Sequence, residues 1–318
     1  MTNQTLTAIN GVLVGHWTDT ANATGCTVVH CPDGTVGGVD QRGGAPGTRE
    51  TDLLRPMHTV NHINAIVLSG GSAFGLASAD GVMRYLREQN IGFPTGSGVN
   101  VPIVPSAILY DLEIGNPIPP TADAGYEAAV AATDAPVVSG NTGAGAGCTV
   151  GKILGMGQAS KGGLGNAAIQ VGDGLIVTAM VAVNAIGDIL DENGAILTGV
   201  RNPAGGYLRT LDLMRNMAEN PPPPTQNTVI GIVATNAKLN KEQANKIAQM
   251  AHNGLARAVN PAHTMYDGDT IFTMATGEID ADVNVVGAFG AEVMADAIRD
   301  AVRSASDLAN VPSLNTPT

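Results

Sequence analysis

Short apolar runs separated by turn residues recur along most of the chain, and each run predicts a β-strand. The runs are Gly11–Trp17, Gly25–His30, Asn64–Leu68, Ile169–Val171, Leu175–Asn184, Thr228–Thr235 and Ile271–Ala275. Clusters of turn-forming residues, such as Pro32-Asp33-Gly34, stand between them. The chain is therefore expected to build much of its core from sheets.

Longer segments with apolar residues on one helical face alternate with these strands. They are Ala73–Asn90, Ala122–Ala132, Lys241–Ala258 and Gly290–Ser304. In the first, Leu76, Val82 and Leu86 share one face and charged residues occupy the other. Asn240 suits the N-cap of the third. Strand pairs mixed with long helices fit a layered α/β or α+β domain.

Composition refines this expectation. The 318 residues include 41 glycines, 44% are hydrophobic and only 3% are aromatic. Small residues let backbones approach closely, so we expect tightly packed layers in a single domain spanning residues 1–318. The one obvious linker is 218–226, which contains Pro221 to Pro224. Four consecutive prolines favour an exposed polyproline segment, which we expect to lie far from any cleft.

Charge and cysteine usage narrow the partners. A net charge of −12 repels nucleic acid and anionic membranes. The polar start of the chain and the lack of a long apolar run predict neither a signal peptide nor a transmembrane helix. Cys26, Cys31 and Cys148 lack metal-binding spacing and suit a reducing cytoplasm. These features predict a cytoplasmic protein.

Common catalytic and nucleotide-binding motifs do not fit. The Gly-rich segments Ser69–Gly75 and Thr142–Gly147 lack the phosphate-loop and dinucleotide spacings, so they indicate close backbone packing around an active-site cleft. His58 and His62 have helical metal-site spacing but no acidic partner in the metalloprotease pattern. No metal or organic cofactor is therefore expected, and the chain shows no serine-hydrolase elbow.

A series of segments resembles a known family. In chain order they read GVLVGHWTD, TGCTVV, LSGGSAFGLASADGVMRYL, AILYDL, NTGAGAGCTVGK, KGGLG, VAVNAIGD, IVATNAKL and NPAHTMYDGDTIFTMATG. They resemble the DmpA-type peptidases, which include the D-aminopeptidase/esterase, the β-peptidyl aminopeptidases and the nylon-oligomer hydrolases. The resemblance runs from about Gly11 to Val302. It implies a four-layer α/β/β/α sandwich, of the type shared with ornithine acetyltransferases, and a homo-oligomer, by resemblance a tetramer.

The resemblance also implies a mechanism. Precursors in this family are cut on the N-terminal side of a Ser or Thr, whose hydroxyl becomes the nucleophile. A hydroxyl needs a nearby base, and a free α-amine, with a pKa near 8 in model peptides, can serve without a histidine. The expected reaction is hydrolysis of a small uncharged or cationic amide, a short peptide or an oligoamide through an acyl-threonine.

Two threonines compete as the nucleophile. Thr264 follows a Pro-Ala-His lead-in that resembles the family's processing junction, and it is favoured. Thr270 follows Gly268-Asp269 and begins a strand directly. Cleavage before Thr264 would give fragments 1–263 and 264–318. Relatives usually carry Asn or Gly before the scissile bond, and His263 departs from that pattern. From the residues alone, both threonines also fit ordinary turn and strand positions.

Five further residues match family motifs. Asn184 and Tyr110 match donors to the oxyanion, Lys152 matches a cation near the nucleophile, and Asp282 and Asn284 resemble the polar pair that orients it. From the residues alone they also fit a strand end, a core aromatic, a surface charge and loop positions.

Two alternative functions remain open at this stage. One is an acyltransferase of the ornithine-acetyltransferase type, which would pass the acyl group to an amine rather than to water. The other is an unprocessed homologue that binds a small molecule without catalysis.

Overall fold

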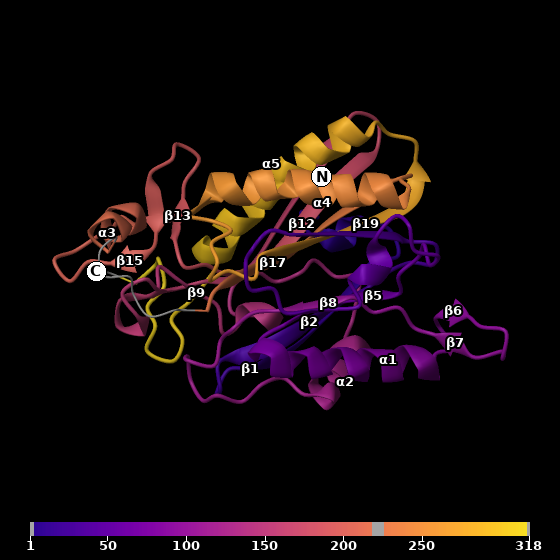
Figure 1. Cartoon of the computed structure of the whole chain (residues 1–318), viewed down its shortest axis with the longest axis horizontal. Helices are drawn as coiled ribbons and strands as arrows, with labels where there is room; N and C mark the ends of the chain where they lie inside the picture. The colour runs from indigo at the N-terminus through magenta and orange to yellow at the C-terminus, as the bar shows by residue number, and fades with distance from the viewer. Residues whose placement is uncertain (1–2, 218–225, 317–318) are drawn as a thin grey trace.

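The computed structural model, which describes residues 3–217 and 226–316, contains two five-stranded sheets that pack face to face (Figure 1). In spatial order the first sheet has β1 (Leu13–Asp19), β2 (Thr24–His30), β5 (Ala65–Ser69), β8 (Ser106–Ile108) and β4 (Thr48–Arg49). The second has β11 (Gly163–Val171), β12 (Leu175–Asn184), β17 (Thr228–Ala237), β19 (Thr270–Ile279) and β3 (Val36–Gln41). The two sheets form the two central layers.

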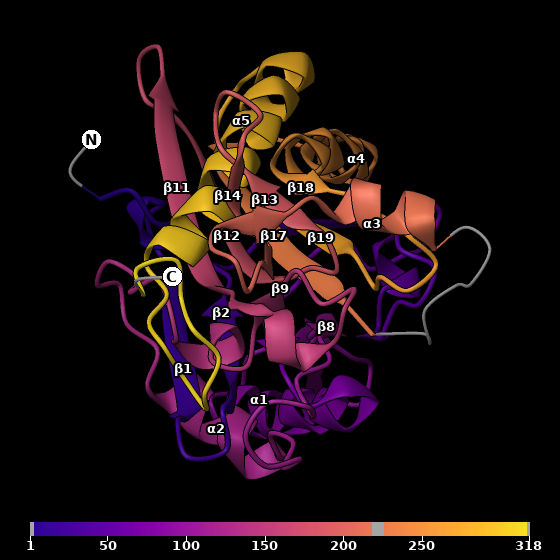
Figure 2. The ribbon, with the colours of Figure 1, turned by 90° about the vertical axis from the view of Figure 1, so that its left-hand side faces the viewer.

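Helices cover the outer face of each sheet, as the two orthogonal views show (Figures 1 and 2). The helices on the first sheet are α1 (Ser78–Glu88) and α2 (Ala122–Val130), and those on the second are α4 (Lys241–Ala258) and α5 (Val283–Arg303). The predicted four-layer α/β/β/α sandwich is confirmed. None of the helices within residues 3–217 and 226–316 is long and apolar enough to cross a lipid bilayer.

Short elements extend the ends of the sandwich. They are α3 (Thr210–Asn216), β6 (Phe93–Pro94), β7 (Asn100–Val101), β9 (Thr149–Val150), β10 (Ser160–Lys161), β13 (Asp188–Leu190), β14 (Ile196–Thr198), β15 (Val200–Arg201), β16 (Tyr207–Leu208), β18 (Val259–Asn260) and the 3-10 turns Leu6–Ala8, Asp52–Leu54, Ser72–Ala77, Gly143–Gly145 and Met156–Gln158.

The burial of β12 explains its unbroken apolar sequence. Val177 and Val181 pack toward the helices, whereas Met180 and Ala182 point into the core between the sheets. Successive side chains of a strand point to opposite faces, so a strand with both faces covered reads as a continuous apolar run. The same explanation applies to the apolar runs of β17 and β19.

The helix expected over Lys241–Ala258 has those bounds, but the one expected over Ala73–Asn90 is α-helical only from Ser78, after a 3-10 turn, and the C-terminal helix begins earlier than expected. Asn240 caps α4 in a capping box with Gln243, as its position in the sequence predicts. The helix predicted from Gly290 instead starts at Val283, because the Asp282 side chain accepts a hydrogen bond from the Asn284 amide at 2.7 Å and caps it there. The segment around Asp282 and Asn284 is therefore a helix start rather than an extended strand.

The contact between α4 and α5 depends on Gly254. A Cβ atom built there would lie 1.9 Å from the Ala291 carbonyl oxygen, so we predict that Gly254→Ala destabilises the protein. Alanine gains about 1 kcal/mol of helix propensity over glycine, but forcing the two helix backbones apart should cost more. The expected net loss is about 1–3 kcal/mol of unfolding free energy, measured by chemical denaturation.

Gly96→Ala is the matched control, because a Cβ atom there meets no atom within 4 Å. Its unfolding free energy should stay close to that of the wild type. A Gly254→Ala variant as stable as the wild type would show that the helix contact is looser than described.

Candidate active site

Strand ends from both sheets meet at one end of the sandwich. In the second sheet, Asn184 at the end of β12 is the direct cross-strand partner of Thr228 at the start of β17. Tyr110 follows β8 of the first sheet, and Asp269 directly precedes β19. The pairing of β12 with β17 therefore brings together two residues that are 44 positions apart along the chain.

Asn184 is fully buried and ties several of these segments together. Its Nδ2 donates to the Tyr110 carbonyl at 2.9 Å. Its Oδ1 accepts hydrogen bonds from Lys152 Nζ at 2.8 Å and from the Thr149 amide at 3.0 Å. A carboxamide nitrogen carries two hydrogens, and the bond to the Tyr110 carbonyl uses one of them.

Lys152 is only 5% exposed, which rules out the interpretation of this residue as a surface charge. Burial lowers its pKa to about 8, and nearby acidic groups, including Asp267, oppose that shift. The structure thus places a cation against Asn184, as the family motif implies.

A cavity of about 220 Å³ opens beside these residues. The residues that line it are Ala45, Pro46, Gly47, Ser72, Ala73, Ile108, Tyr110, Gln226, Asn227, Thr228 and Tyr266. Every one of these described lining residues is formally neutral, and Thr264 is not among them. The cavity is therefore lined both by Tyr110, which follows β8 of the first sheet, and by Thr228, which begins β17 of the second.

The Gly-rich segment before α1 forms one wall of this cavity, through Ser72 and Ala73. A Cβ atom at Gly70 would lie 2.1 Å from Asp111 Oδ2, and Gly71 has a φ of +83°. The Asp111 carboxylate accepts hydrogen bonds from the Gly71 amide and the Thr24 hydroxyl. The predicted close packing around a cleft is found here.

The Thr228 hydroxyl contacts the carbonyl of the preceding residue. Its side chain is nearly buried, and its Oγ1 donates to the carbonyl of Asn227, the residue immediately before it. An attacking hydroxyl must approach that carbonyl if the bond between the two residues is to break. Asn227 is also the residue type that the family resemblance expects before the scissile bond.

Two buried carboxylates flank Thr228. Asp269 Oδ1 accepts the Val229 amide at 2.8 Å, one residue beyond the hydroxyl. Asp267 Oδ2 accepts the Thr264 amide at 2.7 Å and the Thr264 hydroxyl at 2.6 Å. Burial raises the pKa of Asp267 to about 6, the charge of Asp269 adds to the shift, and the bonds from Thr264 oppose it.

The two threonines favoured by the sequence are placed differently. The Thr264 hydroxyl is bound to Asp267, and the buried Thr270 hydroxyl donates to the Gly268 carbonyl at 2.9 Å. Neither lines the cavity with Tyr110. Sequence reasoning overlooked Thr228, although it stands at the head of an apolar run and follows an Asn, one of the residue types that the resemblance expects before the scissile bond.

The structure does not bring Asp282 and Asn284 to this site. They cap α5 beyond the far end of β19, whose ten residues separate them from Thr270 by roughly 30 Å. Asp267 and Asp269, spaced by two in the YDGD motif, are the acidic pair that lies beside the threonine. The residues Pro221 to Pro224 lie outside the described residues, but Gln226, which follows them, lines the cavity.

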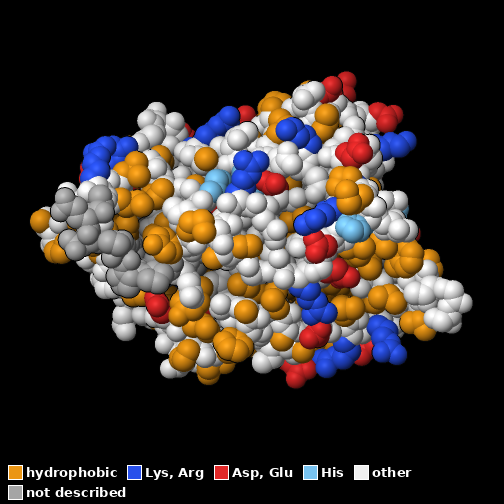
Figure 3. Space-filling model, in the orientation of Figure 1, with side chains coloured by type: hydrophobic (Ala, Val, Ile, Leu, Met, Phe, Trp, Pro, Cys, Tyr) orange, Lys and Arg blue, Asp and Glu red, His pale blue; other side chains and the backbone are white. Residues whose placement is uncertain are grey.

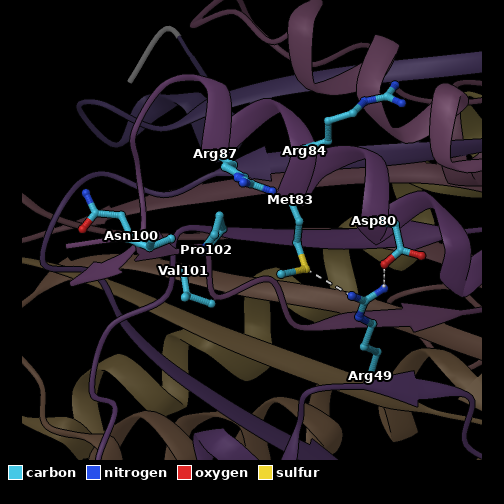
Figure 4. Close-up of a pocket in the computed structure, with 9 residues that line it drawn as sticks. Arg49, Asp80, Met83, Arg84, Arg87, Asn100, Val101 and Pro102 are labelled. Carbon is cyan, nitrogen blue, oxygen red and sulfur yellow. Dashed lines mark hydrogen bonds and ion pairs between the residues drawn. The ribbon is translucent and has the colours of Figure 1, made fainter. Parts of the chain in front are cut away.

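A second and larger cavity, of about 570 Å³, lies between α1 and the β7 segment (Figure 4). Arg49 donates there to Asp80 at 2.6 Å and to the Met83 sulfur at 3.1 Å. It contains none of the residues predicted for catalysis, so size alone does not mark the reactive site. Over the face in Figure 3, basic and acidic side chains are interspersed.

The architecture and the buried cluster define a peptidase-type amide hydrolase. The chain belongs to Peptidase family S58, whose model matches residues 4–313. It is 40% identical to an uncharacterized aminopeptidase of Mycobacterium leprae, over 97% of this chain and 92% of that protein. It is 33% identical to a 6-aminohexanoate-oligomer endohydrolase of Kocuria sp., over 92% of this chain and 84% of that protein.

Solved structures share the fold at lower identity. The L-aminopeptidase D-Ala-esterase/amidase of Ochrobactrum anthropi, described as a variant of the Ntn hydrolase fold, superimposes with a TM-score of 0.74 at 19% identity, over 97% of this chain and 88% of that chain. A Burkholderia sp. β-aminopeptidase gives 0.72 at 21% identity, over 98% and 89%. The expected family and the activity on amide bonds are confirmed.

The two shifted groups predict a bell-shaped pH profile for amide hydrolysis. Asp267 carries its charge above about pH 6, and Lys152 carries its charge below about pH 8. If both charges support the reaction, kcat/KM falls as pH drops through about 6 and again as it rises through about 8. Asp267→Asn should remove the acid limb near pH 6 and lower the maximum.

Asp282→Asn is the control, because asparagine also caps helices and the site lies at the other end of β19. Its profile should keep both limbs. If the acid limb shifts in Asp282→Asn and stays unchanged in Asp267→Asn, the result would favour Asp282 and Asn284, the pair assigned from sequence.

Proposed function

We propose that the protein is a self-processing amidohydrolase whose nucleophile is Thr228, freed by cleavage of the Asn227–Thr228 bond. The observation that carries this proposal is the hydrogen bond from the Thr228 hydroxyl to the Asn227 carbonyl. Both residues line the same cavity as Tyr110. Cleavage would give fragments 1–227 and 228–318 instead of 1–263 and 264–318.

Self-processing would follow an N-to-O acyl shift. Thr228 Oγ1 attacks the Asn227 carbonyl carbon, the C–N bond breaks, and the hydroxyl proton passes to the departing amine. Water then hydrolyses the resulting ester, which leaves a carboxylate on Asn227 and a free amine on Thr228. That amine is the base for later turnovers, in which the hydroxyl attacks the substrate carbonyl and water releases the acyl group.

The neighbouring groups have definable roles in this scheme. The Tyr110 hydroxyl and the remaining Asn184 N–H can donate to the oxyanion, and such donors contribute about 2.7–4 kcal/mol each when aimed at developing charge. The Lys152 cation favours the neutral form of a nearby amine, which is the form needed for a base. Asp269 holds the Val229 amide and so keeps Thr228 in place at the start of β17.

The cavity supports a compact, uncharged acyl group as substrate. Its described lining is neutral, and its volume is about 220 Å³, so a short amide or the terminal unit of an oligoamide fits better than a folded chain. Hydrolysis at such a site requires no cofactor. The free cysteines Cys26, Cys31 and Cys148 support a reducing, cytoplasmic location, and the family resemblance supports a homo-oligomer.

The first test of this function is intact mass analysis of purified protein. We expect two masses corresponding to 1–227 and 228–318, which stay associated because β17 pairs with β12 of the large fragment and β19 pairs with β3. Thr228→Ala should give one folded, inactive chain, whereas Thr228→Ser keeps a hydroxyl and should still be cleaved.

Thr264→Ala is the matched control for this test. It should still be cleaved before Thr228, since the Thr264 hydroxyl only contacts Asp267 and Tyr266. Cleavage before Thr264 or Thr270 in the wild type, or an uncleaved wild type that hydrolyses amides, would refute the role given to Thr228.

A second test concerns substrate charge, with the p-nitroanilides of glutamine and glutamate as a nearly isosteric pair. A carboxylate entering the neutral cavity loses hydration without meeting a cationic partner in the described lining. We expect kcat/KM to be at least about tenfold higher for glutamine, because a loss of about 1.4 kcal/mol already gives that factor. Equal kcat/KM values for the two substrates would show that the acyl group binds outside this cavity.

A further inference from the structure

Asp269, which holds the backbone next to Thr228, is itself held by a histidine. Asp269 is 1% exposed, and its two oxygens face different segments. One accepts the Val229 amide at 2.8 Å. The other accepts both the backbone amide of His263, at 3.0 Å, and the ring Nδ1 of His263, at 2.8 Å. The carboxylate therefore bridges the His263 turn and the backbone beside Thr228.

The Asp269 side chain takes the place of a backbone hydrogen-bond acceptor next to the first paired residues of β17 and β19. The parallel pairing of β17 with β19 begins at Ile230 opposite Thr270, so Val229 lies one residue before it. Asp269 directly precedes β19, and its side chain supplies the acceptor that the strand backbone does not. Once the bond before Thr228 is cut, this contact and the pairing with β12 are what hold the new chain end.

His263 is held in an unusual conformation to make these contacts. Its φ is +58°, a left-handed value that costs a non-glycine residue free energy. Such backbone strain persists where the surrounding structure imposes it, and it is common at functional sites. Here the conformation lets the amide and the ring of one residue reach the same carboxylate oxygen.

A second histidine backs the His263 ring. The His252 ring packs edge-on against it, with centroids 4.8 Å apart, and the His252 Nε2 lies 3.0 Å from the Asp40 carbonyl. Burial lowers the pKa of His252 to about 4, so this ring is neutral at physiological pH. It fixes the position of the His263 ring without adding a charge next to Asp269.

We infer that His263 is a positioning residue for the nucleophile: through Asp269 it fixes the Val229 amide and thereby the Thr228 hydroxyl. It touches neither the cavity nor the scissile bond, so it acts on the rate of attack rather than on substrate binding. This role rests on the proposed function of Thr228.

The test compares His263→Gly with His263→Asn. Glycine adopts the positive φ without strain but removes the ring donor. Asparagine tolerates the same φ better than most residues and can offer an N–H close to the position of Nδ1. For the glycine variant we expect slower self-cleavage and a lower kcat, each by on the order of 10- to 100-fold, with KM nearly unchanged. Asparagine should restore most of both rates.

His30→Gln is the remote control, since His30 ends β2 in the first sheet and its Nε2 contacts the Ala129 carbonyl of α2, away from Thr228. Rates are normalised to the folded fraction from thermal melts, so that a general loss of stability does not mimic the effect. A His263→Gly variant with wild-type cleavage and kcat, in protein whose wild type is split before Thr228, refutes the positioning role alone. If His263→Gly is slow and His263→Asn is equally slow, the positioning role is also refuted. A wild type that is never split before Thr228 overturns this role and the proposed function together.

Discussion

The buried amide of Asn184 is the contact on which the geometry of this site depends. It stands at the end of β12, pairs across the ladder with Thr228, and bonds to Lys152, Thr149 and the Tyr110 carbonyl. A buried carboxamide that lost one of these partners would leave an unsatisfied polar group at a cost of about 1–3 kcal/mol. These bonds thus tie the end of β12 in the second sheet to the segment that follows β8 in the first.

Three ionisable side chains are buried together near the site. Lys152, Asp267 and Asp269 are each at most 5% exposed. Burial lowers the pKa of Lys152 to about 8 and raises that of Asp267 to about 6, and the attraction between these two opposite charges opposes both shifts. A site of this kind can change its protonation near neutral pH, which is what proton transfer between a hydroxyl and an amine requires.

The fold was largely predictable because both faces of its sheets are covered. A strand buried on both faces must be apolar throughout, so the runs Leu175–Asn184 and Thr228–Thr235 predicted β12 and β17 nearly to the residue. The helix boundaries were predictable where a local cap was recognised, as at Asn240, and not where it was overlooked, as at Asp282. The shortest strands, such as β4 and β8, gain their order only from neighbours in the sheet and carry no periodic signal.

The sequence by itself determined the class of chemistry and several of its groups. The motifs around Tyr110, Lys152 and Asn184 predicted parts that the structure brings together, because each motif is a local stretch of chain with its own pattern. Which threonine stands among them was decided only by the tertiary structure. Thr228, Thr264 and Thr270 are all near-equivalent turn or strand-start residues locally, and only the pairing of β12 with β17 places the first beside Asn184. The same holds for Asp269, whose side chain contacts the Val229 amide 40 positions away along the chain, and for His263, which contacts that carboxylate, because such contacts leave no periodic trace in the sequence.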